Sequence, residues 1–122
     1  MNKLKLMTPK ILAALLAIPM ILAGFAKLAG TPELHQSFEM MGLPQWFGYF
    51  IGLAELVGGI GLLVSRFSAL ASLALIPIML GAAYFHIAYS VPSAVPAIAF
   101  TLLAGIVAYL RREEAMWFPI KA

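Results

Sequence analysis

The stretch GLAELVGGIGLL, residues 52–63, places one carboxylate, Glu55, in the middle of an apolar, glycine-rich run. On a helix Glu55 shares one stripe, at steps of three or four residues, with Gly48, Gly52 and Gly59. Small residues on one stripe allow another helix to approach closely, or they leave a cavity. In either case the stretch predicts a helix whose polar stripe faces protein and not lipid.

The chain around this stretch is too apolar for a soluble domain of its size. Hydrophobic residues make up 63% of its 122 residues and charged residues 11%, against about 45–50% and about 25% in soluble domains. No Lys, Arg, Asp or Glu occurs between Arg66 and Arg111, a run that as helix is roughly 66 Å long, enough for two crossings of a ~30 Å hydrocarbon core. The runs 11–30 and 45–65 carry one charge each. We therefore expect one all-α domain over residues 1–122, a membrane-embedded four-helix bundle with spans at about 9–29, 45–64, 67–89 and 95–110.

A short amphipathic helix is expected between the first two spans. Thr31 and Pro32 have the residue types of an N-cap and a first helical turn, Gly42 can end the helix, and Pro44 can start the next one. About ten residues are too few to cross a membrane, so this helix is expected to lie on the outer surface. His35 lies on it and is interpreted as a solvated residue and not as a ligand.

Basic residues predict the orientation in the membrane. With four spans, both ends of the chain and the turn at 65–67 lie on one side. That side carries every Lys and Arg except Lys27, namely Lys3, Lys5, Lys10, Arg66, Arg111, Arg112 and Lys121. Because cytoplasmic loops are enriched in Lys and Arg, we expect a multi-pass protein of the bacterial inner (plasma) membrane with both termini cytoplasmic.

The same basic residues bear on two alternatives. The basic start before the first apolar run resembles a secretory signal peptide, but three more spans follow, so we expect a retained signal anchor. The formal net charge of +3 is interpreted as a topology signal, so the lipid bilayer and not nucleic acid is the expected partner.

Two further ionisable groups lie within spans, Lys27 in the first and His86 in the third. Each lies on a helix stripe of small residues or methionine. Lys27 shares its stripe with Met20 and Gly24, and His86 shares its stripe with Met79 and Ala83. By helix rise, Lys27 and His86 lie roughly 12 Å above the membrane midplane, and Glu55 lies near it. Side chains lean toward the N-terminus of their own helix. Because the second span runs opposite to the other two, we expect a Glu55–Lys27 pair with His86 nearby.

Such a polar layer has two interpretations. An isolated charge at membrane depth costs at least about 2.5–3.5 kcal/mol, and intramembrane ionisable residues usually mark a functional site. Lys27, Glu55 and His86 are therefore candidates for ligand binding or proton relay, with a pocket or packing stripe formed by Met20, Gly24, Gly48, Gly52, Gly59, Met79 and Ala83. The alternative is an ion pair that only locks the bundle.

The sequence identifies no catalytic residue. It contains no Ser–His–Asp set, phosphate-binding loop or metal-ligand spacing, so no metal site is expected. Cysteine is absent, which excludes thiol chemistry and iron–sulfur ligation by this chain.

The segments FAKLAG (25–30), MGLP (41–44), GLAELVGGIGLL and GAAYFH (81–86) occur in this order. With them the chain resembles the DoxX family of small four-helix membrane proteins, from about Ile11 to Tyr109. The family's recurrent polar positions fall on Lys27, Glu55 and His86, and its structural positions fall on Gly24, Gly42, Pro44, Gly58 and Gly59. The resemblance implies a four-helix membrane bundle but no single activity. Some relatives are subunits of quinone-linked oxidation of sulfur compounds, some associate with redox-defence enzymes, and distant eukaryotic relatives act as membrane assembly factors.

Two functions are compatible with these features. The first is a subunit or accessory of a membrane oxidoreductase that binds a small, quinone-like ligand, an apolar molecule with a polar head, in an outer-half pocket lined by Lys27, Glu55 and His86. Because the chain lacks cysteine, electron transfer would need a bound quinone or a redox partner protein. The second is a non-enzymatic assembly factor or interaction protein, whose glycine stripe and polar layer recognise another membrane protein.

Neither enzymatic activity nor oligomeric state is decided by the sequence. Ala69 and Ala104, taken as lipid-facing, leave room for a homodimer but equally suit packing within one bundle.

Overall fold

The structure, a computed structural model, describes residues 3–89 and 93–115, with side chains from Met7 onward. Within these residues it forms five α-helices and a short 3-10 helix, namely α1 (Lys3–Leu28), α2 (Pro32–Met40), α3 (Gln45–Leu62), α4 (Ser65–Ala88), α5 (Val95–Leu110) and η1 (Arg112–Glu114).

The all-α prediction is confirmed. The helix α1 begins earlier than expected, and because Ser65 already starts α4, the turn expected at 65–67 lies just before it. The side chains of Lys3 and Lys5, all of Lys121, and residues 90–92 between the third and fourth expected spans lie outside the described residues.

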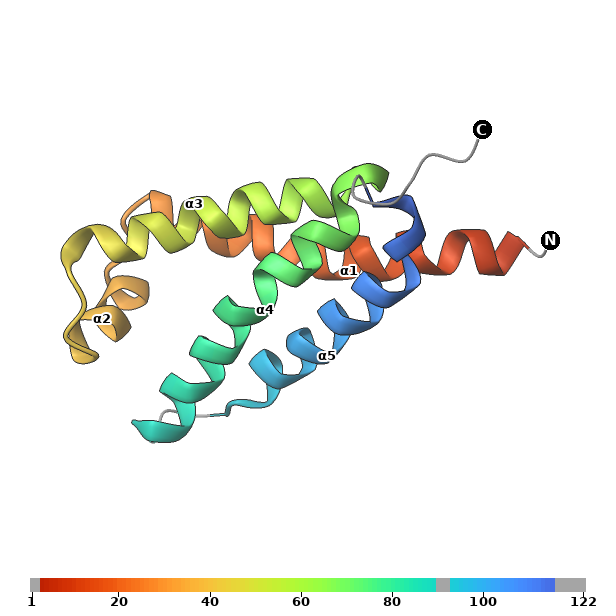
Figure 1. Cartoon of the computed structure of the whole chain (residues 1–122). Helices are drawn as coiled ribbons and strands as arrows, with labels where there is room; N and C mark the ends of the chain where they lie inside the picture. Colours follow the sequence, from red (N-terminus) through yellow and green to blue (C-terminus); the bar gives the residue numbers. More distant parts are fainter. Residues whose placement is uncertain (1–2, 90–92, 116–122) are drawn as a thin grey trace.

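The long helices form two hairpins. The helices α1 and α3 run antiparallel and side by side, and α4 and α5 form the second pair (Figure 1). Because α3 also packs on α4 and α1 on α5, the four helices contact one another in a ring. The hairpins meet at the end that holds the start of α1, the α3–α4 turn and the end of α5, here called the terminal end. They diverge toward the opposite end, here called the α2 end because α2 lies there (Figure 1).

The apolar core lies where the hairpins meet. Its largest fully buried apolar side chains are Leu16, Leu62, Leu75 and Val107, one from each long helix. Small residues fill the space between them, including Ala13, Ala17, Ala71 and Ala104. Because α1, α4 and α5 contribute buried alanines and α3 contributes buried glycines, the four helices can approach closely.

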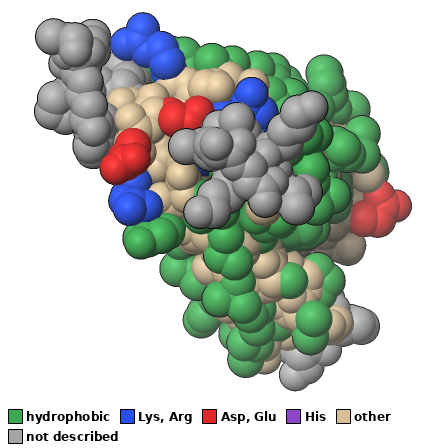
Figure 2. Space-filling view, turned by 90° about the vertical axis from the view of Figure 1, so that its right-hand side faces the viewer, with side chains coloured by type: hydrophobic (Ala, Val, Ile, Leu, Met, Phe, Trp, Pro, Cys, Tyr) green, Lys and Arg blue, Asp and Glu red, His purple; other side chains and the backbone are tan. Residues whose placement is uncertain are grey.

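Large apolar side chains also cover the outside of the molecule, whereas two serines of α4 are buried inside it. Leu22, Ile87 and Leu102 are 64–68% exposed, whereas Ser68 and Ser72 are fully buried. Figure 2 shows hydrophobic side chains over the flanks of the molecule as seen from the terminal end. Soluble monomers rarely expose so much contiguous apolar surface, so this exterior suits contact with lipid.

Two alanines that were expected to face lipid do not. Ala69 and Ala104 are fully buried within the chain, because α4 and α5 pack on each other and on the first hairpin. The lipid-facing placement is therefore wrong, and these residues pack within one molecule instead of offering a surface to a second copy.

Two of the described helices are long and apolar enough to cross a bilayer, over Met7–Leu28 and Ser65–Ala88. The helix α5 is apolar but has 16 residues, roughly 24 Å, which is shorter than a ~30 Å hydrocarbon core. The helix α3 has 18 residues and includes Glu55. Length and composition thus support two crossings directly.

The short helix α2 is held between two glycine turns. Gly30 and Gly42 have φ of 81° and 76°, a left-handed conformation that glycine adopts without steric cost. The residue after each glycine donates its N–H to the carbonyl five residues earlier, as in a Schellman C-cap. Thr31 precedes α2 as predicted, but its hydroxyl donates back to the Ala26 carbonyl at 2.8 Å and does not cap α2.

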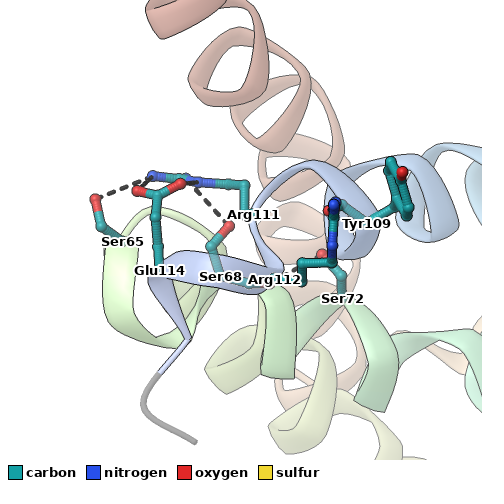
Figure 3. A network of polar contacts seen from close by, with 7 residues as sticks. All are labelled: Ser65, Ser68, Ser72, Tyr109, Arg111, Arg112 and Glu114. Atoms are coloured by element: carbon teal, nitrogen blue, oxygen red, sulfur yellow. Dashed lines mark hydrogen bonds and ion pairs between the residues drawn. The ribbon is translucent and has the colours of Figure 1, made fainter. Parts of the chain in front are cut away.

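At the terminal end a buried arginine joins α5 to α4. Arg111 is 2% exposed. Its Nη1 and Nη2 donate to the hydroxyls of Ser68 and Ser65 at 3.1 and 3.0 Å, and its Nε and Nη2 hold the Glu114 carboxylate at 3.0 and 3.2 Å. Figure 3 shows the guanidinium of Arg111 pointing toward these partners. The distribution of basic residues predicts only the orientation of Arg111 and not this clamp, although serines at regular spacing on the apolar helix α4 indicate a polar partner.

Candidate functional site

The polar stripe of α3 faces α1 at very short range. A Cβ added to Gly52 would lie 2.7 Å from the Cβ of Lys27, and one added to Gly24 would lie 2.7 Å from the carbonyl oxygen of Gly52. Gly59 is equally confined, because Ile21 Cγ1 would lie 2.7 Å from its Cβ. The glycines at positions 24, 52 and 59 therefore let the two backbones approach closely, so these positions serve packing between α1 and α3.

This close packing brings a buried lysine and a buried glutamate together. Lys27 Nζ lies 2.7 Å from Glu55 Oε1, and the two side chains are 13% and 4% exposed. The contact is an ion pair, because an ammonium and a carboxylate of opposite charge lie within direct contact. The ammonium charge is thus what compensates the burial of the carboxylate. The expected pair is present, and its functional role stays a prediction.

The structure does not bring His86 to this pair. His86 lies near the end of α4, on the hairpin that diverges from α1 and α3 (Figure 1), and its ring lies edge-on to Phe85 with centroids 5.8 Å apart. Met20 and Met79 belong to the shared core, and Ala83 is also buried. The stripes of α1 and α4 therefore meet in the apolar core through Met20 and Met79.

His35 occupies the place beside the pair that was expected for His86. Its Nε2 lies 2.8 Å from the main-chain oxygen of Lys27, and its ring centroid lies 4.4 Å from that of Tyr49. A Cβ on Gly48 would lie 2.6 Å from His35 Cε1, so this glycine makes room for the imidazole. The interpretation of His35 as a solvated residue is incomplete, because this residue is half-buried and its ring is bonded to the main chain of Lys27. Gly48 was the sequence signal for the packing of His35 on α3. This glycine lies one turn before Gly52, beyond the end of α1, so a residue outside α1 has to cover it.

A cavity of about 610 Å³ lies beside His35, within the ~300–1,000 Å³ range of small-molecule sites. Its wall combines aromatic rings with polar side chains from α2, the start of α3 and the turn before α2. The lining residues are Gly30, Pro32, His35, Phe38, Glu39, Pro44, Gln45, Trp46 and Tyr49. Neither Lys27 nor Glu55 is among them, so the cavity and the ion pair are linked through the bond between His35 and the Lys27 carbonyl.

The comparisons with known proteins bear on the chain as a whole. Comparison with curated proteins and with solved structures finds no match. A family model described as the DoxX-like family matches residues 11–111, which include the ion pair, His35 and every residue of the cavity wall. This match covers most of the chain and confirms the resemblance found in its motifs. The chain is a membrane protein and belongs to the DoxX-like family.

Proposed function

We propose that this protein binds a quinone-like molecule in the cavity at the α2 end, as a subunit or accessory of a membrane oxidoreductase. The observation that carries the proposal is the cavity of about 610 Å³, whose wall residue His35 contacts the main chain of Lys27, the lysine of the buried Lys27–Glu55 ion pair. Intramembrane charges that lie next to a cavity are typical of ligand or proton sites.

The cavity wall fits a flat ring with polar oxygens. Phe38, Trp46 and Tyr49 offer aromatic faces and edges against which a ring can pack. The Tyr49 hydroxyl and the Gln45 amide are donors that suit a quinone carbonyl. Because the chain has no cysteine, electrons would pass through the bound quinone to a redox partner protein and not through a thiol of this chain.

The proposal includes a topology. With α3 and α5 as additional crossings, the protein is a four-span bundle of the bacterial inner membrane with both termini in the cytoplasm. The terminal end then faces the cytoplasm and carries Lys10, Arg66 and Arg112, in line with the distribution of basic residues in membrane proteins. The α2 end then lies at the outer interface, where Trp46 and Tyr49 belong to the aromatic belt.

The assembly-factor alternative loses the surface on which it was based. The positions that were to recognise another membrane protein, Gly52 and Gly59, are already in contact with Lys27 and Ile21 of α1. Bulky substitutions there would disrupt the α1–α3 pair itself, so they do not report on partner capture.

Ligand retention tests the proposal. Wild-type protein, Trp46→Ala and Phe50→Ala are purified in mild detergent, and bound small molecules are identified by mass spectrometry with an optical spectrum. Trp46 and Phe50 are both exposed aromatics of α3 with ring centroids 6.2 Å apart, but only Trp46 lines the cavity. Phe50→Ala is therefore the matched control, and Glu55→Gln tests the contribution of the charge pair.

The expected result is one quinone-like molecule per chain in the wild type and in Phe50→Ala, with at least a tenfold lower content in Trp46→Ala. Folded wild-type protein that carries no such molecule, and takes none up from added ubiquinone or menaquinone, contradicts the proposal. Equal loss in Trp46→Ala and Phe50→Ala would also count against the cavity as the site.

A further inference from the structure

The helix α2 forms one wall of the cavity, yet few side chains hold it in place. None of its residues is buried, and among the described elements it packs chiefly on α3 and α1. Four of its residues, Pro32, His35, Phe38 and Glu39, line the cavity. The shape of the cavity therefore depends on what holds α2 against the first hairpin.

We infer that His35 positions this wall, and that it acts through a single atom, Nε2. Nε2 lies 2.8 Å from the Lys27 carbonyl oxygen. A carbonyl only accepts hydrogen bonds, so Nε2 must carry the proton in this contact. The bond ties the middle of α2 to the last turn of α1, at the residue whose side chain pairs with Glu55.

The surroundings of the ring fix its orientation. One side lies against Tyr49, with centroids 4.4 Å apart, and the edge that carries Nδ1 and Cε1 lies over Gly48, where a Cβ would lie 2.6 Å from Cε1. A second ring of α2, Phe38, meets Phe47 with centroids 5.5 Å apart, but this contact is apolar and has no directional bond. His35 is thus a positioning residue, with the donor at Nε2 as its working group.

The role of the cavity rests on the proposed function, but the positioning of α2 does not. The position of α2 can be measured without any ligand. If α2 behaves as inferred and no quinone is found, the proposed function fails and the assignment of His35 stands.

Three substitutions of His35 distinguish the contribution of the Nε2 donor from that of the aromatic ring. Glutamine carries its amide nitrogen where His35 has Nε2, asparagine carries it where His35 has Nδ1, and phenylalanine keeps a ring without a donor. Spin labels are placed on Gln36→Cys in α2 and Ile60→Cys in α3, both exposed positions. Because the chain has no cysteine of its own, only these two sites are labelled, and the distance distribution between them is measured by pulsed electron resonance.

The inference predicts one narrow distance peak for the wild type and for His35→Gln, and loss of that peak to a broad distribution for His35→Asn and His35→Phe. Gly48→Ala should broaden it as well, because the added Cβ displaces the ring. A wild-type distribution in His35→Asn and His35→Phe overturns the inference. Broadening in His35→Gln equal to that in His35→Phe assigns the role to the ring and overturns the assignment to Nε2.

Discussion

Lys27 makes two contacts with separate parts of the residue. Its ammonium pairs with Glu55, and its carbonyl oxygen bonds to His35. Removing one partner of a buried ion pair leaves an uncompensated charge and costs about 3–5 kcal/mol. The carbonyl contact survives any substitution at residue 27 that keeps the helix, so the two contacts can be tested independently.

Lys27→Met is expected to lower the free energy of unfolding by about 3–5 kcal/mol. Lys27→Met combined with Glu55→Leu should lose much less than the sum of the single variants, because the second substitution removes the stranded carboxylate. Denaturant unfolding of the detergent-solubilised protein measures both. Lys10→Met, at an exposed lysine of α1, is the control and should change little. Additive losses in the double variant would show that the two side chains are not coupled.

Residues differ in how far their partners can be predicted. The Lys27–Glu55 pair follows from helix periodicity and depth alone, since both lie on stripes of known direction. His35 could not be placed in this way, because its partner is a main-chain carbonyl that every residue has. The partners of Arg111 could not be predicted either. Ser68 lies 43 residues away in the chain, and the two side chains come into contact only when α4 and α5 pack together.

At the scale of elements, α1 and α3 owe their contact to glycines that leave no space for a side chain. The Cβ of an alanine at position 24 would lie 2.7 Å from both Gly52 O and Leu56 N, which are main-chain atoms that cannot move away without a shift of the whole helix. Gly105 of α5 offers the contrast, since a Cβ there would meet nothing within 4 Å.

Gly24→Ala is accordingly expected to lower stability by about 1–3 kcal/mol through overpacking. Gly105→Ala should be neutral or raise stability by up to about 1 kcal/mol, because alanine favours helix more than glycine does. Thermal unfolding followed by circular dichroism compares the two. Equal unfolding midpoints for the two variants would mean that the α1–α3 contact is looser than the structure has it.

The clamp between α5 and α4 depends on the shape of the guanidinium group. Arg111→Lys keeps the charge but cannot serve Ser65, Ser68 and Glu114 at once, because lysine lacks the planar fork of donors. We expect a loss of about 1–3 kcal/mol and faster amide hydrogen exchange near residues 65–68. Arg112→Lys, at an exposed position, is the matched control and should leave the exchange rates there unchanged. Unchanged exchange in Arg111→Lys would contradict the clamp.

Element bounds were more predictable than element directions. Turn residues such as Gly42 and Pro44 mark where helices stop and start, so α3, α4 and α5 begin and end close to the expected residues. No residue pattern in the sequence indicates that α4 diverges from α3. This divergence arises from the packing of whole hairpins, and this is why His86 lies away from Lys27 although its stripe has the same spacing.

At the scale of the molecule, the start of α1, the α3–α4 turn and the end of α5 lie together at the terminal end (Figure 1). If that end faces the cytoplasm, α2 lies on the other side of the membrane. Single cysteines test this on a chain that has none. In intact cells a membrane-impermeant maleimide should label Gln36→Cys in α2 and reach Glu113→Cys in η1 only after permeabilisation. The reverse pattern would show that the protein is inserted the other way round.

The first hairpin also has a consequence for how the protein is made. The ion pair joins residues 27 and 55, and the cavity is lined by residues between 30 and 49, so the whole candidate site lies in α1, α2 and α3. Chains emerge from the ribosome N-terminus first and fold progressively. The site can therefore be complete while α4 and α5 are still being synthesised, and the last helix then closes the ring of contacts by packing against the first.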